Sequence, residues 1–271
     1  MIPSERQQLE EHLLDVWEAA RPPSLREYDQ IPMVRDDLLA SVKAAAPQLA
    51  GKRVAFMGDH DGVSVVLGML VANGLVPAPL SMRILDFDER LLIQAEHVAA
   101  RYGFSHLLNV SLYNAFDAVP ASLVGKSDAY YTNPPYGMSN AGASVRLFMT
   151  RGMELASRVG ARGYVVLPYD CQRSWTQDAK EHTFRFVTGH GWDVVNFVPE
   201  IHSYHLDDDP HLKSALLTIE AGSGQRRRLP WQGRGVDHHE IAHFYGRSVL
   251  APYPRYLLRN QTLMYMDKAA S

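Results

Sequence analysis

The chain has 271 residues and a formal charge of −3 at pH 7, and 46% of its residues are hydrophobic. This composition is typical of a globular protein with one sizeable core, and it lacks the general basic field that nucleic-acid binding requires. The single cysteine, Cys171, excludes an intrachain disulfide framework and a zinc site of several thiolates. We expect a cytoplasmic protein with neither a secretory signal nor a membrane span.

The first fifty residues are expected to form a helical cap (residues 1–50). Between Pro3 and Ala20, leucines and a tryptophan recur at helical spacing among charged residues. Arg21-Pro22-Pro23 ends this helix. A second amphipathic helix is predicted from Asp36 to Ala46, and it ends near Pro47.

Between residues 51 and 220, apolar strands alternate with helices. The predicted strands are Arg53 to Met57, Ser81 to Phe87, Leu107 to Leu112, Asp128 to Thr132, Gly163 to Pro168, Asp193 to Glu200 and Ser214 to Glu220. The predicted helices are Val63 to Ala72, Glu89 to Tyr102, Ala143 to Arg158 and Thr176 to His190. This order predicts an α/β fold with a mostly parallel sheet and an antiparallel edge hairpin, the outline of the Rossmann-like class I methyltransferase fold. Residues 221–271 are expected to form a tail packed on this core.

The first strand–helix turn is the candidate site for a nucleoside. In open α/β sheets the ligand lies at the carboxyl ends of the strands, where glycines allow close approach. An acid after the second strand accepts hydrogen bonds from ribose hydroxyls, and Asp88 is also the better candidate for the cap of the next helix. The glycine spacing matches neither a dinucleotide nor a triphosphate motif. The candidate cofactor-binding residues are Gly58, Gly62, Asp86, Asp88, Asn114 and Asp117.

The stretch from Ala129 to Gly137 is a β-prone run that stops at two prolines. Pro134 and Pro135 fix the backbone and donate no N–H, so they hold the neighbouring carbonyls in one orientation. The side-chain oxygen of Asn133 and a proline carbonyl can accept the N–H groups of an attacking amine, while Tyr136 covers its apolar side. The pattern predicts a loop that positions a nucleophilic nitrogen.

Taken together, these motifs resemble the branched-chain polyamine synthases, which make N4-bis(aminopropyl)spermidine. The resemblance covers roughly residues 25 to 220 and leaves the C-terminal tail outside. It rests on Asp29-Gln30, Gly51-Lys52-Arg53, Gly58-Asp59-His60-Asp61, Leu85-Asp86-Phe87-Asp88-Glu89-Arg90-Leu91, Asn133-Pro134-Pro135-Tyr136, Leu147-Phe148 and Arg151-Gly152.

The resemblance implies an aminopropyltransferase that uses decarboxylated S-adenosylmethionine as donor. The residues by themselves leave S-adenosylmethionine open as the donor. In that family a Gly-Asp-Asp-Asp signature orients and deprotonates the acceptor amine. This chain keeps the acids Asp59 and Asp61 and has His60 in place of the middle acid. An imidazole has an unperturbed pKa suited to proton transfer, so His60 is a candidate base. Asp170 and Glu200 are candidates for a wider acidic field that attracts a polyamine, whereas the run Asp207-Asp208-Asp209 is also explained as a solvated hairpin tip.

Two other functions remain open at the level of sequence. The Asn-Pro-Pro-Tyr motif is also the signature of N-methyltransferases that act on an adenine or a glutamine amine, and Arg226 to Arg228 and Arg234 favour that alternative. His239-Glu240-Ile241-Ala242-His243 spells the helical motif of zinc hydrolases, although twelve histidines make a chance match easy. We expect a small-molecule amine as substrate, nucleic acid as a disfavoured partner, and no metal; the sequence allows a homodimer.

Overall fold

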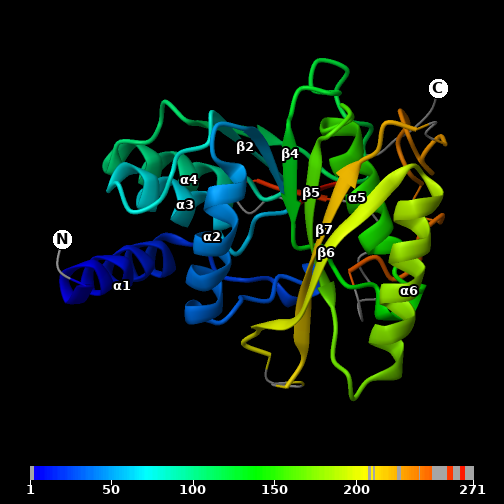
Figure 1. The fold of residues 1–271 in the computed structure, drawn as a ribbon, viewed down its shortest axis with the longest axis horizontal. Coiled ribbons are helices and arrows are strands. Elements are labelled where there is room, and N and C mark those ends of the chain that lie inside the picture. Colours follow the sequence, from blue (N-terminus) through cyan, green and yellow to red (C-terminus); the bar gives the residue numbers. More distant parts are fainter. Residues whose placement is uncertain are drawn as a thin grey trace.

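The structure is a computed structural model that describes residues 3–206, 209, 211–224, 227–237, 239–245, 255–258 and 263–265. Seven strands form one sheet in the order β3-β2-β1-β4-β5-β7-β6, and a separate pair, β8-β9, lies in the tail (Figure 1). The strands are β1 (Arg53–Met57), β2 (Ser81–Asp86), β3 (Leu108–Leu112), β4 (Ala129–Thr132), β5 (Arg162–Pro168), β6 (Trp192–Ser203), β7 (Lys213–Ala221), β8 (Arg255–Leu257) and β9 (Leu263–Tyr265). The first five run parallel, while β7 pairs antiparallel with both β5 and β6. The predicted class I methyltransferase-like fold with an antiparallel edge is confirmed.

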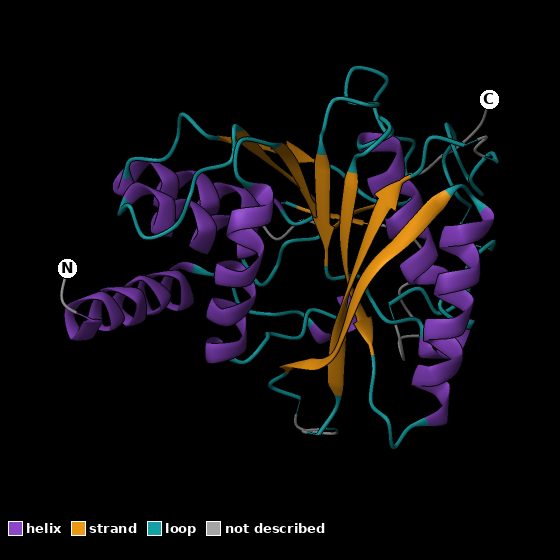
Figure 2. Cartoon of the chain, viewed as in Figure 1, coloured by secondary structure: helices purple, strands orange, loops and turns teal. Residues whose placement is uncertain are grey.

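Helices cover both faces of the sheet (Figure 2). They are α1 (Pro3–Ala20), α2 (Arg35–Leu49), α3 (Val63–Ala72), α4 (Glu89–Tyr102), α5 (Ala143–Leu155) and α6 (Ser174–Gly189), with short 3₁₀ turns at η1 (Arg26–Tyr28) and η2 (Met138–Asn140). Helices α1 to α4 lie on one side of the sheet and α5 and α6 on the other (Figure 1). None of the helices in the described ranges is both long enough and apolar enough to cross a membrane.

Each face of the sheet has its own apolar core. On the first face, Trp17 of α1 and Leu49 of α2 are fully buried together with Val66 of α3. On the second face, Met149 of α5 packs with residues that follow the sheet in sequence, among them Phe244. The N-terminal helices and the segment up to residue 245 therefore contribute to the cores on which the sheet rests.

The largest differences from the predicted helix bounds, three residues each, are at the carboxyl ends of α2 and α5. Helix α2 runs through Pro47 to Leu49, because a proline in the last turn removes only one helical hydrogen bond while Leu49 becomes fully buried. Helix α5 ends at Leu155 and does not reach Arg158. The carbonyls of Glu154 and Leu155 accept hydrogen bonds from N–H groups of a loop, so these carbonyls of the last helical turn have hydrogen-bond partners outside the helix.

The strand register gathers the candidate residues at one edge of the sheet. Met57, the last residue of β1, lies opposite Leu85 of β2 and Thr132 of β4. The turn after β1, the acid that ends β2 and the loop after β4 are therefore neighbours in space. This arrangement follows from parallel pairing, in which the carboxyl ends of the strands meet at the same edge.

Candidate active site

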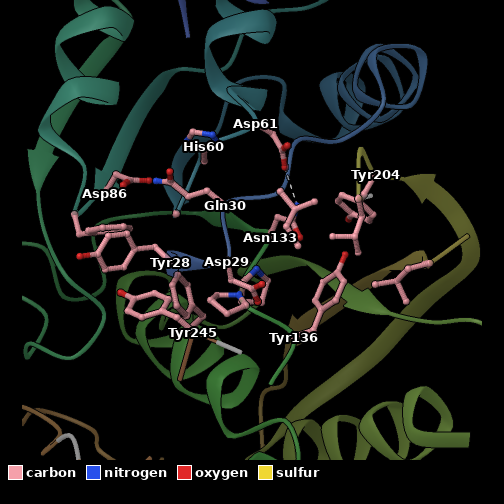
Figure 3. A pocket seen from close by; sticks show the side chains of 18 residues that line it. Tyr28, Asp29, Gln30, His60, Asp61, Asp86, Asn133, Tyr136, Tyr204 and Tyr245 are labelled. Carbon is pink, nitrogen blue, oxygen red and sulfur yellow. Dashed lines mark hydrogen bonds between the residues drawn. The ribbon is translucent and has the colours of Figure 1, made fainter. Parts of the chain in front are cut away.

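A cavity open to solvent lies at the carboxyl ends of β1, β2 and β4 (Figure 3), and the space between its walls, with the open solvent included, is about 700 Å³. Its wall includes residues from the N-terminal cap, the sheet edge, the β6–β7 hairpin and the tail. They are Tyr28, Asp29, Gln30, Ile31, Gly58, His60, Asp61, Asp86, Phe87, Asn133, Pro134, Pro135, Tyr136, Phe148, Tyr204, Leu206, Leu212 and Tyr245. Figure 3 shows Asp86, Tyr28 and Tyr245 at one end and Asn133, Tyr136 and Tyr204 at the other.

The two glycines of the β1–α3 turn have different tasks. Gly58 lines the cavity with φ +66°, and an added Cβ would lie 2.9 Å from the ring of Phe148. Gly62 lies outside the cavity wall, where a Cβ would lie 2.1 Å from the indole of Trp17. The indole nitrogen of Trp17 donates to the carbonyl of Asp61 at 2.6 Å. Gly58 thus lets the ring of Phe148 pack on the turn, whereas Gly62 lets the N-terminal helix pack against it.

The two acids of the turn also separate in role. Both oxygens of Asp59 accept from backbone N–H groups at the start of α3, from Val63 and Ser64, each at 3.0 Å. Asp59 is buried and lies outside the cavity wall, and burial raises its pKa to about 7. It organises the helix start.

Asp61 joins the two motifs that the sequence singled out. One of its oxygens accepts from the backbone N–H of Met33 at 2.8 Å, and the other accepts from the side-chain nitrogen of Asn133 at 2.7 Å. The contact to Asn133 spans 72 residues of sequence. Burial raises the pKa of Asp61 above its ordinary value, against the effect of these hydrogen bonds. Asp61 is the acid of the signature that lines the cavity.

His60 lines the cavity but is poorly matched to proton transfer at neutral pH. Its Nε2 lies 2.8 Å from the hydroxyl of Ser24, and within the described part of the chain Nδ1 has no hydrogen-bond partner. Burial lowers the pKa of His60 to about 3, and the nearby Arg21 acts in the same direction. The imidazole is therefore neutral at physiological pH and a weak base, so the structure favours Asp61 over His60 as the proton acceptor.

The acid that ends β2 points into the cavity, and the next acid does not. The two oxygens of Asp86 accept from the N–H groups of Asp59 at 3.0 Å and Asp88 at 2.9 Å, and burial raises the pKa of Asp86 to about 8. Asp88 is fully buried, accepts from the N–H of Arg90 at 3.0 Å and caps α4. The capping role foreseen for Asp88 is confirmed, and of the two acids Asp86 alone lines the cavity.

The candidates after β3 are turned toward the protein. The side-chain oxygen of Asn114 accepts from the N–H of Phe116 at 3.0 Å, and Asp117 accepts a hydrogen bond from the hydroxyl of Tyr256 in the tail. Neither Asn114 nor Asp117 belongs to the cavity wall. Phe244 packs edge-on against Phe116, with ring centroids 4.3 Å apart, so the tail covers this turn.

At the other end of the cavity, Tyr136 meets Tyr204 edge to face, with ring centroids 5.9 Å apart. The hydroxyl of Tyr204 lies 2.8 Å from the hydroxyl of Ser214, which in turn lies 2.9 Å from Nδ1 of the fully buried His202. Burial lowers the pKa of His202 to about 4, so this imidazole is neutral and acts as a hydrogen-bond anchor. A buried network therefore holds Tyr204 beside the Asn133 loop.

Comparison with known proteins identifies the family. A model of the branched-chain polyamine synthase A C-terminal domain matches residues 10–215, which is more than half of the chain. The chain belongs to the branched-chain polyamine synthase family. A search of curated protein sequences finds no match.

Solved structures show the same fold. The Thermus thermophilus branched-chain polyamine synthase, in complex with N4-aminopropylspermidine and 5′-methylthioadenosine, is 21% identical with a TM-score of 0.65, covering 83% of this chain and 68% of that one. Its C9 mutein, with the same ligands, is 22% identical with a TM-score of 0.65, over 82% and 66%. A proposed RNA methyltransferase from Pyrococcus horikoshii is 14% identical with a TM-score of 0.58, over 79% and 98%. The chain thus spans about two thirds of the length of the Thermus proteins.

In this member of the polyamine synthase family, the wider acidic candidates lie outside the cavity wall. Asp170 accepts from Arg173 at 2.8 Å, and Glu200 accepts from the N–H of Cys171 at 2.9 Å. Ligand atoms of Asp170, Cys171 and Glu200 lie within 4.8 Å of one another. Asp209 pairs with Arg173, while Asp207 and Asp208 lie outside the described residues.

The hydrolase alternative is wrong, because its motif needs a regular helix and the structure has turns from His239 to His243. His239 and His243 are exposed, and Glu240 pairs with Arg234 at 2.6 Å. The ion pair with Glu240 also neutralises Arg234, one of the arginines that favoured the N-methyltransferase alternative. Arg226 lies outside the described residues.

Sequence reasoning missed several wall residues. Gln30 was noted only as part of the family resemblance, and Tyr28 and Tyr245 were not considered, yet all three line the cavity. Tyr28 and Tyr245 pack edge to face, with ring centroids 5.3 Å apart, although more than two hundred residues separate them. A local sequence pattern carries no signal for a contact between such distant residues.

Proposed function

We propose that this protein is an alkyltransferase that moves an aminopropyl-type group from decarboxylated S-adenosylmethionine, or from S-adenosylmethionine itself, to an amine nitrogen. The observation that carries the proposal is the 2.7 Å hydrogen bond between Asp61 and Asn133 inside a cavity whose opposite end holds Asp86. One end is suited to a nucleoside and the other to an amine.

The donor end is suited to a nucleoside that carries no phosphate groups. Gly58 has no Cβ, so the ring of Phe148 can pack directly on the turn at this end. Asp86 keeps spare lone pairs on both oxygens because each accepts only one backbone N–H. Ribose hydroxyls are the natural donors to such a carboxylate. Tyr28 and Tyr245 supply the apolar surface that an adenine ring needs.

The acceptor end is built to present a nitrogen lone pair. The amide nitrogen of Asn133 donates to Asp61, and its amide oxygen is the atom that we assign to accept from the amine N–H. Pro134 and Pro135 hold this loop rigid. Asp61 takes the amine proton, since its raised pKa makes it a stronger base than an ordinary carboxylate.

The transfer step balances as follows. The amine nitrogen attacks the carbon of the transferred group that is bonded to the sulfonium, so a C–N bond forms as the C–S bond breaks. The bonding electron pair returns to sulfur, which leaves neutral 5′-methylthioadenosine, and the amine proton goes to Asp61. The protein supplies position and proton acceptance and needs no metal for either.

The experiment that tests this function follows the nucleoside product. Each donor is incubated with a panel of amines, and products are identified by mass spectrometry. Release of 5′-methylthioadenosine supports transfer of the alkyl chain, and the donor that gives it tells aminopropyl from 3-amino-3-carboxypropyl transfer. Release of S-adenosylhomocysteine would instead mean methyl transfer and would refute the proposal. Asp61→Asn is expected to lower the rate with either donor.

We propose the cytoplasm as the compartment, because the single cysteine, Cys171, is free and exposed, as suits a reducing environment. A small-molecule amine is the proposed partner. Fractionation followed by blotting tests the compartment.

A further inference from the structure

Gln30 brings the N-terminal cap to the donor end of the cavity. It follows the 3₁₀ turn η1, lines the cavity and is 5% exposed. The segment that carries it is closed on itself. The backbone N–H of Gln30 donates to the carbonyl of Leu25 at 3.3 Å, and the side-chain oxygen of Gln30 accepts from the N–H of Leu25 at 2.8 Å. The side chain is therefore held by a loop of fixed shape.

Two hydrogen bonds fix the orientation of the side-chain amide of Gln30. The N–H of Leu25 can only donate, so its partner is the amide oxygen. The carboxylate of Asp88 accepts from the other end of the amide at 3.2 Å, so that end is the nitrogen Nε2. A flipped amide would lose both contacts. The position of the N–H groups of Gln30 therefore follows from its partners.

This orientation leaves one N–H of the amide for a ligand. Nε2 carries two hydrogens, and one of them is donated to Asp88. The described part of the chain supplies no acceptor for the other. Asp88 in turn donates its backbone N–H to Asp86 at 2.9 Å, and Figure 3 shows the amide of Gln30 turned toward Asp86. Because a buried N–H without an acceptor is costly, we expect the ligand to supply one.

A carboxylate by itself meets only half of the hydrogen-bonding capacity of a ribose. Each ribose hydroxyl has one hydrogen to donate and lone pairs that accept. The two oxygens of an ionised Asp86 can take the hydrogens of both hydroxyls, but they have no hydrogen to give to the hydroxyl oxygens. An amide N–H beside Asp86 supplies that hydrogen. A hydroxyl that accepts from the amide also becomes a stronger donor to the carboxylate.

We propose, building on the transferase function above, that Gln30 is a donor-binding residue. Its Nε2–H donates to the oxygen of one ribose hydroxyl, and the hydrogen of that hydroxyl is donated to Asp86. The site then recognises a ribonucleoside and discriminates against the deoxynucleoside that lacks this hydroxyl. The N-terminal cap thus takes part in donor recognition as well as in the packing of the sheet.

The test measures how three nucleosides bind to the full chain: 5′-methylthioadenosine and its 2′-deoxy and 3′-deoxy analogues, by calorimetry at one pH. Gln30→Met keeps a side chain of similar length and removes the amide. We expect this variant to bind 5′-methylthioadenosine and one of the analogues about tenfold more weakly. The other analogue already lacks the hydroxyl that Gln30 contacts, so its affinity should change less than about twofold. An equal loss for all three nucleosides, or no loss for any, would overturn the proposal.

Two more variants complete the test. Gln30→Glu keeps the length of the side chain and an oxygen for the N–H of Leu25, but its carboxylate donates no N–H. It should show the same selective loss, and it carries the test if Gln30→Met does not fold. Gln48→Met makes the first substitution at an exposed glutamine outside the cavity wall and should leave all three affinities unchanged.

The outcomes separate this inference from the function on which it rests. If the parent protein binds none of the three nucleosides, the donor site is wrong, and the proposed transferase function falls with it. If the parent binds 5′-methylthioadenosine and the Gln30 variants weaken all three nucleosides equally, Gln30 only shapes its loop. In that case the assignment of Gln30 to the ribose falls alone.

Discussion

Donor binding is expected to depend on pH through Asp86. Burial raises the pKa of Asp86 to about 8, so at pH 7 only about one tenth of the unliganded protein has this carboxylate ionised. Ribose hydroxyls donate hydrogen bonds, and donated hydrogen bonds favour the ionised form. Binding therefore lowers the pKa of Asp86 and releases a proton. Affinity approaches its full value near pH 9 and is lost as the pH falls through about 8.

The size of the effect follows from the ionised fraction. Between pH 7 and pH 9 that fraction rises from about one tenth to about nine tenths, which predicts an increase of about tenfold in affinity. The suitable probe is 5′-methylthioadenosine, because its neutral sulfur removes charge attraction from the measurement. Calorimetry at pH 7, in buffers of different ionisation enthalpy, should show release of nearly one proton per nucleoside bound.

Two variants separate this cause from a general effect of pH. Asp86→Asn removes the titrating group and should give weak, pH-independent affinity. Asp193→Asn changes an exposed acid on β6, outside the cavity, and should keep the slope of the parent. A flat affinity in the parent protein, or a slope that persists in Asp86→Asn, would refute the assignment of Asp86 to the ribose.

Three further predictions concern the acceptor loop, the turn and the fold. Asn133→Ala should lower turnover about a hundredfold in steady-state assays while binding of 5′-methylthioadenosine stays within about twofold, because only the amine loses its orientation; weakened nucleoside binding would argue against this. His60→Ala should keep every ionisation of the pH–rate profile between pH 5 and 9, since the pKa of His60 is about 3, and a missing ionisation would restore His60 as the base. Gly62→Ala should lower the free energy of unfolding in urea by about 3 kcal/mol or more, because the indole of Trp17 occupies the space that the new Cβ needs. Gly103→Ala, at a similar φ but with open space around it, should lower it by only about 1–2 kcal/mol. Equal losses in the two variants would contradict the steric cause.

The strands and helices were predictable because the apolar residues of each recur at the spacing that is typical of a strand or a helix. The apolar run of β1 and the helical spacing in α4 need no tertiary information, and the predicted bounds of α1, β1, α3 and α4 match the structure. Helix ends set by distant groups were not predictable. Leu155 ends α5 because Ser127, far away in sequence, donates to its carbonyl.

The candidate site was predictable where it follows from sheet topology. Asp61 and Asn133 follow adjacent parallel strands, so their contact could be expected once β1 and β4 were placed. Of the acids Asp86 and Asp88, the sequence favoured Asp86 for the ribose and Asp88 for the cap of α4, and the structure has Asp88 in that cap. The contribution of Tyr245 depends on the path of the tail, for which the sequence has no local signal.

The position of β7 affects how the protein is made. This strand is the last of the sheet to be synthesised, yet it lies between β5 and β6. Until residues 213–221 have left the ribosome, β5 has no partner on that side, and Leu217 and Ile219, fully buried in the final sheet, are not yet in place. At about 5–20 residues per second, the nascent chain spends several seconds with an open strand edge. We therefore expect the edge of β5 to be open to pairing with other chains until β7 is in place.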